Sequence, residues 1–100
     1  MNKNNDFLNI LRSIANHPES SQRSLAKKIG LSLGKLNYCL KALKQKGLVK
    51  AKNFKNNKNK KYYLYILTPK GIAEKTKLTL NFMNLKMKEY DELKKELLDK

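Results

Sequence analysis

The chain has 100 residues, of which 40% are apolar and 31% are charged, and its formal net charge at pH 7 is +15. This size allows one domain with a modest core, and the charge indicates an anionic partner. A single cysteine excludes an internal disulfide, and the sequence has neither a secretory signal nor an apolar run long enough to cross a membrane. We therefore expect a cytoplasmic, nucleoid-associated protein with no membrane attachment.

The distribution of charge is more informative than its total. Residues 20–73 contain fourteen Lys and Arg but no Asp or Glu. A surface without acids suits contact with phosphates, because nothing on it repels a polyanion. Codon bias in an AT-rich genome would also enrich lysine, but it does not explain the missing acids. The pattern predicts a nucleic-acid-binding face in this part of the chain.

Two helices are predicted first. Asp6 is expected to cap a helix over residues 6–16, where apolar side chains recur at helical spacing before a proline. Ser21 is expected to cap a second helix over residues 21–29 by accepting from a backbone amide. Gly30 follows and favours the left-handed conformation that closes a helix.

A third helix is predicted over residues 33–46, between a cap at Ser32 and a stop at Gly47. Its two faces differ in character. The apolar face, expected in the core, consists of Leu36, Cys39, Leu40 and Leu43. The polar face with its flanks, expected in solvent, consists of Gly34, Lys35, Asn37, Tyr38, Lys41, Lys44 and Gln45.

A hairpin and one long helix are predicted for the rest of the chain. Residues 48–54 and 62–67 are rich in β-branched and aromatic side chains, and the segment between them has no apolar residue. Thr68 is expected to cap a helix that runs from its proline to about Leu98, roughly 45 Å at 1.5 Å per residue.

This order of elements is that of a winged helix-turn-helix, a mainly α fold with a small β-hairpin. The spacing of a small residue, a turn glycine and an inward apolar residue at Ala26, Gly30 and Leu36 supports it. We expect residues 1–71 to form the DNA-binding domain and residues 72–100 to form a dimerisation helix.

The fold predicts how double-stranded DNA would be bound. The third helix would enter the major groove, where Lys donates to guanine and Asn or Gln pairs with adenine. The start of the second helix would meet a flanking phosphate, and the hairpin lysines would meet the backbone or the minor groove. The candidate DNA-binding residues are Ser21, Gln22, Arg23, Ser32, Gly34, Lys35, Asn37, Tyr38, Lys41, Lys44, Gln45, Lys55, Lys58, Lys60 and Lys61.

Three stretches carry a more specific pattern. They include Ser21-Gln22-Arg23 with Ser32-Leu33-Gly34-Lys35 and Asn37-Tyr38, then Lys46-Gly47 with Asn53-Phe54, then Leu67-Thr68-Pro69 with Gly71-Ile72 and Glu89-Tyr90. Over about residues 20–97 the sequence resembles the MarR-type regulators associated with exopolysaccharide gene clusters. The resemblance implies a small winged-helix regulator of bacterial surface-polysaccharide genes. The Lys/Asn-rich hairpin tip is a departure from that family's pattern.

The last helix has two apolar stripes, which one helix cannot bury on its own small domain. A second copy is the simplest cover, and a homodimer would place two recognition helices on half-sites about one helical turn apart. The alternative is that the helix folds back on the first helix or frays. The candidate dimerisation residues are Leu78, Phe82, Leu85 and Leu93 in one stripe, and Met83, Met87, Tyr90 and Leu97 in the other.

Other functions stay open at this point. The same basic module could bind RNA or DNA without sequence preference, or act as an adaptor that docks on an acidic protein. Single lysines could be ordinary solvated positions, and Tyr38 could cover an edge of the core. No enzymatic activity, cofactor or metal is expected, because the chain has one His, one Cys and no recognisable catalytic set.

Overall fold

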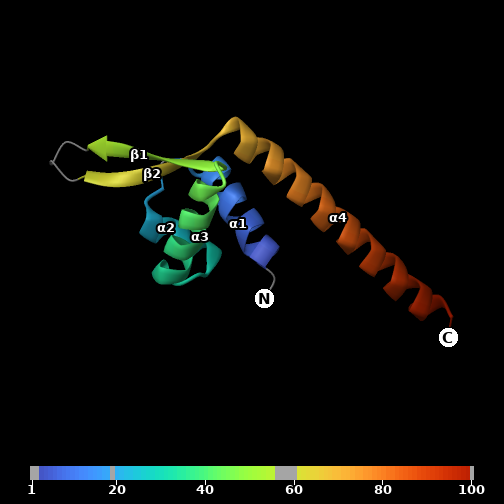
Figure 1. Ribbon diagram of the computed structural model, residues 1–100. Helices are drawn as coiled ribbons and strands as arrows, with labels where there is room; N and C mark the ends of the chain where they lie inside the picture. Colours follow the sequence, from blue (N-terminus) through green and yellow to red (C-terminus); the bar gives the residue numbers. More distant parts are fainter. Residues whose placement is uncertain (1–2, 19, 56–60, 100) are drawn as a thin grey trace.

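The computed structural model describes residues 3–18, 20–55 and 61–99, and Figure 1 shows how they are arranged. Most of the described chain is helical, with one two-stranded antiparallel sheet. The expected mainly helical class with a small hairpin and a long last helix is therefore confirmed. In chain order the elements are α1 (Lys3–Asn16), α2 (Gln22–Ile29), α3 (Leu33–Gln45), β1 (Val49–Lys55), β2 (Lys61–Leu67) and α4 (Pro69–Leu98).

Helix α1 begins earlier than the sequence predicts. It includes Lys3, so Asp6 lies inside its first turn. The Asp6 side chain is buried, and its carboxylate Oδ2 lies 3.7 Å from Nζ of Lys35 in α3. The prediction that Asp6 caps the helix is wrong, because this carboxylate packs against another helix.

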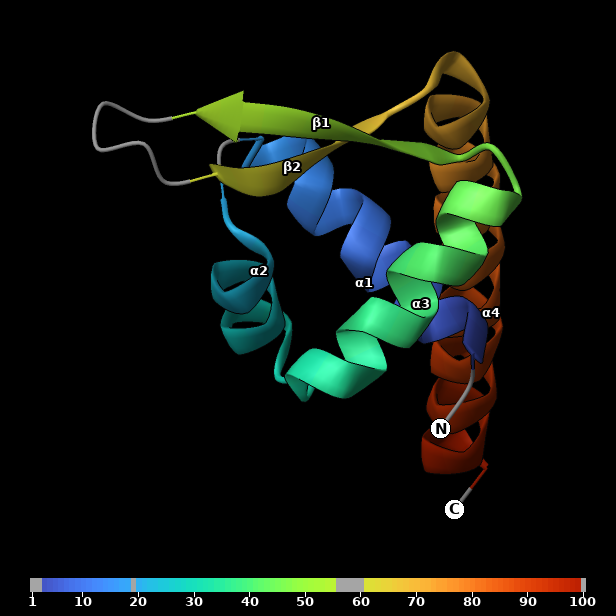
Figure 2. The same ribbon diagram turned by 60° about the vertical axis from the view of Figure 1, so that its left-hand side comes forward.

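The caps around the turn between α2 and α3 are confirmed. Oγ of Ser21 accepts from the amide of Ser24 at 3.2 Å, and Oγ of Ser32 accepts from the amide of Lys35 at 3.1 Å. Gly30 lies between them with a φ of 80°, a conformation that side chains with a Cβ disfavour. The short turn places the amino end of α3 directly beside α2 (Figure 2).

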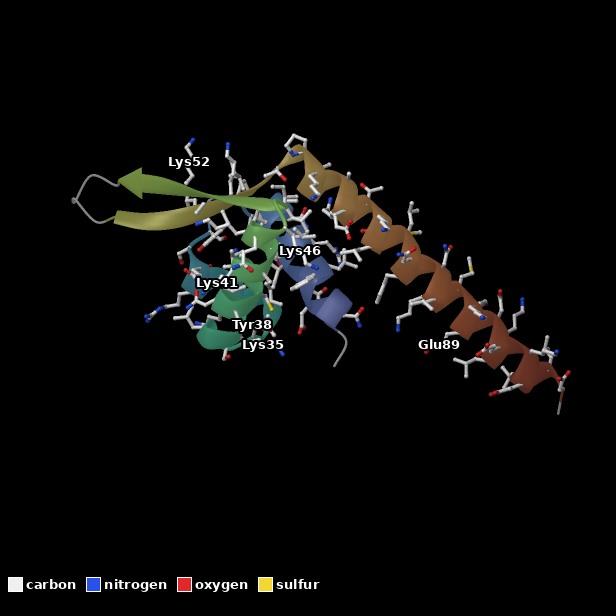
Figure 3. All side chains as sticks on the ribbon, viewed as in Figure 1. Lys35, Tyr38, Lys41, Lys46, Lys52 and Glu89 are labelled. Carbon is white, nitrogen blue, oxygen red and sulfur yellow. The ribbon has the colours of Figure 1, made fainter. Side chains whose placement is uncertain are left out.

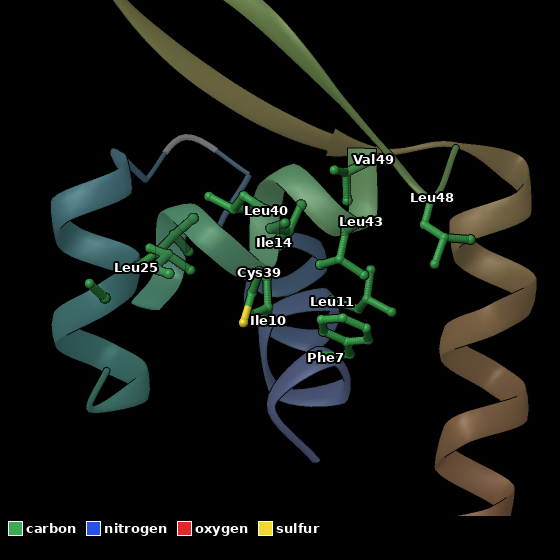
Figure 4. Packing of buried hydrophobic residues seen from close by; sticks show 12 residues of the cluster. Phe7, Ile10, Leu11, Ile14, Leu25, Cys39, Leu40, Leu43, Leu48 and Val49 are labelled. Atoms are coloured by element: carbon green, nitrogen blue, oxygen red, sulfur yellow. The ribbon is translucent and has the colours of Figure 1, made fainter. Parts of the chain in front are cut away.

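The core lies between the first three helices and the base of the hairpin (Figure 4). Helices α1 and α3 contribute four residues each to this cluster, because their apolar residues recur at helical spacing. Cys39 is 2% exposed and lies among these side chains as a small apolar residue, as predicted. The central buried residues are Phe7, Ile10, Leu11, Ile14, Leu25, Ala26, Leu36, Cys39, Leu40, Leu43, Leu48 and Val49.

The hairpin pairs Val49 with Leu67 at its base and Lys55 with Lys61 at its far end. It lies across one end of the helical cluster and extends to the side of α2 (Figure 2). Its base is anchored, because Val49 is buried and Leu67 packs against the core.

Helix α4 leaves this head, residues 3–68, on the side away from the far ends of the two strands (Figure 1). Gly71 is buried and Leu78 packs against the core, so only the first turns of α4 lie on the head. Every residue from Leu80 to Asp99 is exposed. The expected alternative, in which the last helix folds back on the first, therefore describes only the start of α4. Among the described residues, α4 included, none of the helices has the apolar length that crossing a bilayer requires.

Candidate nucleic-acid interface

Helix α3 presents the two faces that its sequence predicts. The four residues of its apolar face are at most 2% exposed and form part of the core. The polar face, by contrast, is open to solvent along the whole helix. Its exposed residues are Gly34, Lys35, Asn37, Tyr38, Lys41, Lys44 and Gln45, and the cap Ser32 is exposed beside them.

The middle of this face is formed by Tyr38 and Lys41. The side chain of Tyr38 is 63% exposed, so it does not serve mainly to cover the core. Figure 3 labels both residues on α3, with Tyr38 next to Lys35 at the lower end of the helix. In the head and the first turns of α4 the structure describes two acids, Asp6 and Glu74. Neither of them belongs to α3 or to the hairpin.

The amino ends of α2 and α3 add to the positive potential. Neither helix has an acid in its first turn, although acids are favoured there by the helix dipole. The unbonded amides of these first turns are therefore not compensated by a carboxylate of the same turn. Such ends favour the approach of phosphate.

Lys35 lies on the flank of α3 that faces α1, beside the buried Asp6 carboxylate. Lys46, just after α3, lies on the same flank, with Nζ 5.4 Å from the centre of the Phe7 ring. The sequence did not reveal the pairing of Asp6 with Lys35. The two residues are far apart in the chain, and only the packing of α1 against α3 brings them together.

The start of α2 and its cap carry three further candidates. Ser21 caps α2 and is partly buried, as is Gln22, whereas Arg23 is exposed. The hydroxyl of Ser21 already accepts from its own helix, so capping is its structural role. Arg23 is the residue of this group with the freest access from solvent.

The hairpin lysines are only partly placed. Lys55 is the last residue of β1 and Lys61 is the first residue of β2, and the backbones of these two residues are paired in the sheet. Lys58 and Lys60 lie outside the described residues. Lys52, which was not a candidate, is exposed on β1 and points away from α3 in Figure 3.

On α4, seven of the eight candidate dimerisation residues are exposed, and Leu78 is the exception. Leu78 packs against the core of its own head, so it is less available to a partner than the sequence suggests. Leu80, which was not a candidate, is 55% exposed. The exposed fractions of the seven are Phe82 37%, Met83 59%, Leu85 65%, Met87 63%, Tyr90 59%, Leu93 58% and Leu97 77%.

Residues 8–50 match the model of a protein family described as winged helix-turn-helix DNA-binding. The matched segment runs from α1 through α3 into β1, so it includes every candidate residue of α2 and α3. A search of curated proteins found no significant sequence match.

Solved structures with the same fold include several transcription regulators. MarR of Staphylococcus aureus, in complex with salicylate and kanamycin, is 23% identical with a TM-score of 0.69; the match covers 87% of this chain and 57% of MarR. A PadR-like transcriptional regulator of Bacillus cereus is 17% identical with a TM-score of 0.79, and the match covers 87% of this chain and 89% of that one. The transcriptional repressor CouR, bound to a 23-mer DNA duplex, is 21% identical with a TM-score of 0.61 over 72% of this chain and 49% of CouR.

The chain therefore spans little more than half the length of the MarR structure and about half that of CouR. The PadR-like protein, in contrast, is matched over most of both chains. Together, the family match over residues 8–50 and these structural likenesses establish that the chain has a winged helix-turn-helix fold, extended by the long helix α4.

Proposed function

We propose that the protein is a dimeric transcription regulator that binds double-stranded DNA in a sequence-specific manner. Helix α3 enters the major groove with its amino end first. The start of α2 contacts a flanking phosphate, and the hairpin lysines contact the backbone or the minor groove.

The observation that carries this proposal is the outer face of α3. Asn37, Tyr38 and Lys41 are all exposed on it, and the first turn of the helix has no acid. An α-helix fits the major groove, where amide and ammonium groups at these positions can donate to base edges. The presence of a DNA duplex in the CouR structure, which shares this fold, supports binding to duplex DNA.

The proposed dimer uses α4, and its exposed residues favour one stripe over the other. The stripe that faces the head changes character along the helix: it carries Leu78 and Phe82 near the head, and beyond the head its leucines, Leu85 and Leu93, are interrupted by Glu89 and Glu96. A face interrupted by acids is a poorer seam for two identical helices than one that stays apolar, because carboxylates would be buried or would meet one another.

The second stripe, which we call the outer stripe, stays apolar to the end of α4 with a single lysine in it. Its side chains recur with alternating steps of three and four residues, the spacing of a left-handed coiled coil. A monomeric protein rarely exposes an apolar surface of this length. The outer stripe consists of Leu80, Met83, Met87, Tyr90 and Leu97, each more than half exposed.

A second copy of α4 is a suitable partner for this stripe. A two-fold axis pairs a surface with itself, so a self-complementary apolar stripe suits it. The distal part of α4 is also electrically balanced: residues 84–100 carry five acids and five lysines, in contrast to the strongly basic head. Two such segments can approach each other without the repulsion that two heads would experience.

The proposal is tested by selecting binding sites from random duplexes and then measuring affinity across salt concentrations. We expect a site made of two related half-sites and an affinity that falls about a thousand-fold or more between about 50 and 200 mM salt. A steep salt dependence without any selected sequence would indicate non-specific nucleic-acid binding instead. Failure to bind duplexes at low salt would favour the adaptor role.

Lys41→Ala is the variant that tests base reading within this experiment. Lys41 lies on the exposed face of α3, so its removal should relax sequence preference at one position of each half-site, by about 1–3 kcal/mol. Lys95→Ala on the distal part of α4 removes the same charge far from α3. It should leave both the preferred sequence and the affinity unchanged.

The resemblance of residues 20–97 to exopolysaccharide-associated regulators leads us to propose surface-polysaccharide genes as the target and the nucleoid as the location. Mapping the selected sequence onto the genome of origin tests this. Sites upstream of polysaccharide genes are expected, and an unrelated distribution of sites would reject the proposed target.

A further inference from the structure

The backbone of Leu48 is hydrogen-bonded both to the end of α3 and to the start of α4. Its amide donates to the carbonyl of Leu43 at 3.0 Å, and the amide of Gly47 donates to the carbonyl of Lys44 at 3.0 Å. With the φ of 75° at Gly47, these two bonds form a Schellman motif, which fixes how the chain leaves α3. The side chain of Leu48 is buried, so the motif is anchored in the core.

The same peptides accept the start of α4. The amide of Thr68 donates to the carbonyl of Leu48 at 3.1 Å, and the Thr68 hydroxyl donates to the carbonyl of Gly47 at 2.6 Å. That hydroxyl also accepts from the amide of Gly71 at 3.0 Å, which caps α4. One side chain therefore bonds the turn that follows α3 to the first turn of α4.

Gly71 brings the two segments into direct backbone contact. A Cβ at this position would overlap the carbonyl oxygen of Leu48 and lie 2.9 Å from its carbonyl carbon. Figure 4 shows Leu48 between the end of α3 and α4. Glycine weakens a helix relative to alanine, so the close approach is a physical reason for glycine here. Gly34, in contrast, has no atom near the place where its Cβ would lie.

A contact that sets the direction of α4 affects the whole dimer, because a small rotation at the start of this long helix becomes a large displacement at its far end. Its 30 residues span about 45 Å, so a rotation of about 5° at its start moves its far end by about 4 Å. One base pair of DNA rises about 3.4 Å and turns the helix by about 35°. A small change in the angle between α3 and α4 therefore displaces a head by about the rise of one base pair, which is enough to change the spacing between half-sites that fits best.

We propose that Gly47, Leu48, Thr68 and Gly71 form an elbow that sets the angle between α3 and α4, and thereby determines which spacing between half-sites the dimer accepts. The inference rests on the proposed function, because it requires a dimer held by α4. Within it, Thr68 and Gly71 determine the spacing without touching DNA.

The test uses full-length protein and a series of duplexes that carry the selected half-sites with spacers that differ by single base pairs. Gly71→Ala removes the close approach, and Thr68→Val removes the hydroxyl while keeping the shape of the side chain. Thr68→Ser keeps the hydroxyl and should behave like the wild type. Asn81→Ala lies exposed on α4 and serves as the matched control. Circular dichroism and sedimentation establish that each variant is folded and dimeric.

Wild-type protein should prefer one spacing, and Gly71→Ala and Thr68→Val should change the affinity ratio between neighbouring spacings by about ten-fold or more. The preferred half-site sequence should stay the same. An equal loss of affinity at all spacings, or an unchanged preference in both variants, would overturn the elbow and leave the proposed function intact. If the wild type selects no pair of half-sites, the proposed function fails, and the inference fails with it.

Discussion

Lys35 has two competing partners if α3 enters a DNA groove. Its ammonium group lies 3.7 Å from the buried Asp6 carboxylate, while half of its side chain remains exposed to solvent. An ion pair of this kind holds the lysine on the α1 flank of the helix. It therefore reduces the share of this positive charge that is available to phosphate.

Asp6→Asn should release Lys35. We expect affinity for duplex DNA to rise by about 1.4- to five-fold, which corresponds to the 0.2–1 kcal/mol of a partly exposed pair, with a steeper salt dependence. The melting temperature should fall slightly, because an acid leaves the first turn of α1. Filter-binding titrations at several salt concentrations measure the affinity and its salt dependence, and thermal unfolding measures the melting temperature. In Lys35→Ala protein the same substitution should bring no gain, and a gain there would refute this explanation.

Gly34 separates folding from binding at a single position. It lies in the first turn of α3, and a Cβ there would meet no atom of the protein within 4 Å. Gly34→Ala should therefore stabilise the fold, by up to about 1 kcal/mol or a few degrees in melting temperature. If the backbone at Gly34 approaches DNA closely, affinity should nevertheless fall about ten-fold. A more stable protein with unchanged affinity would remove Gly34 from the interface.

At the scale of elements, the hairpin and α3 should contribute differently to binding. Contacts to phosphate position a protein on DNA, whereas contacts to bases specify the sequence. Replacing Lys58, Lys60 and Lys61 with Gln should weaken binding to all duplexes alike. It should reduce the slope of log affinity against log salt by up to about three.

The matched control replaces Lys86, Lys88 and Lys95 of α4 with Gln, which removes the same charge from exposed positions away from the head and outside the outer stripe. This triple variant should bind as the wild type does. If both triple variants lose affinity equally, net charge rather than the hairpin would be responsible. A change in the preferred sequence of the hairpin variant would show that the hairpin reads bases.

Most element boundaries could be predicted because local chemistry determines them. Ser21, Ser32 and Thr68 cap their helices by accepting from amides three residues ahead, and a sequence shows that spacing directly. Gly30 and Gly47 have positive φ, as turn glycines after helices were expected to have. The start of α1 could not be predicted from Asp6, because this acid found a partner in another helix.

At the scale of the whole molecule, we expect charged substitutions in the two stripes of α4 to have different effects on dimerisation. Met83→Lys combined with Tyr90→Lys places charges in the outer stripe and should dissociate the dimer. Affinity for a two-half-site duplex should then fall by about a hundred-fold or more, because two linked contacts become independent. Sedimentation velocity and binding to one half-site measure these effects separately.

The comparison variant is Leu85→Lys combined with Leu93→Lys, which places the same two charges in the stripe that faces the head. This variant should remain a dimer if the outer stripe is the seam. Dissociation by the Leu85 and Leu93 pair alone would assign the seam to the head-facing stripe. A monomeric wild-type protein would reject dimerisation through α4 altogether.

The sequence by itself determined the order of the elements, their caps and turns, and which face of α3 is polar. These features depend on residues a few positions apart, so local hydrogen bonding and helical spacing are enough to predict them. Only the tertiary structure decided that Asp6 pairs with Lys35, that Leu78 belongs to the core, and that Gly71 lies on the Leu48 peptide. Such contacts join residues that are distant in the chain, and their geometry follows from how whole helices pack, which no local pattern specifies.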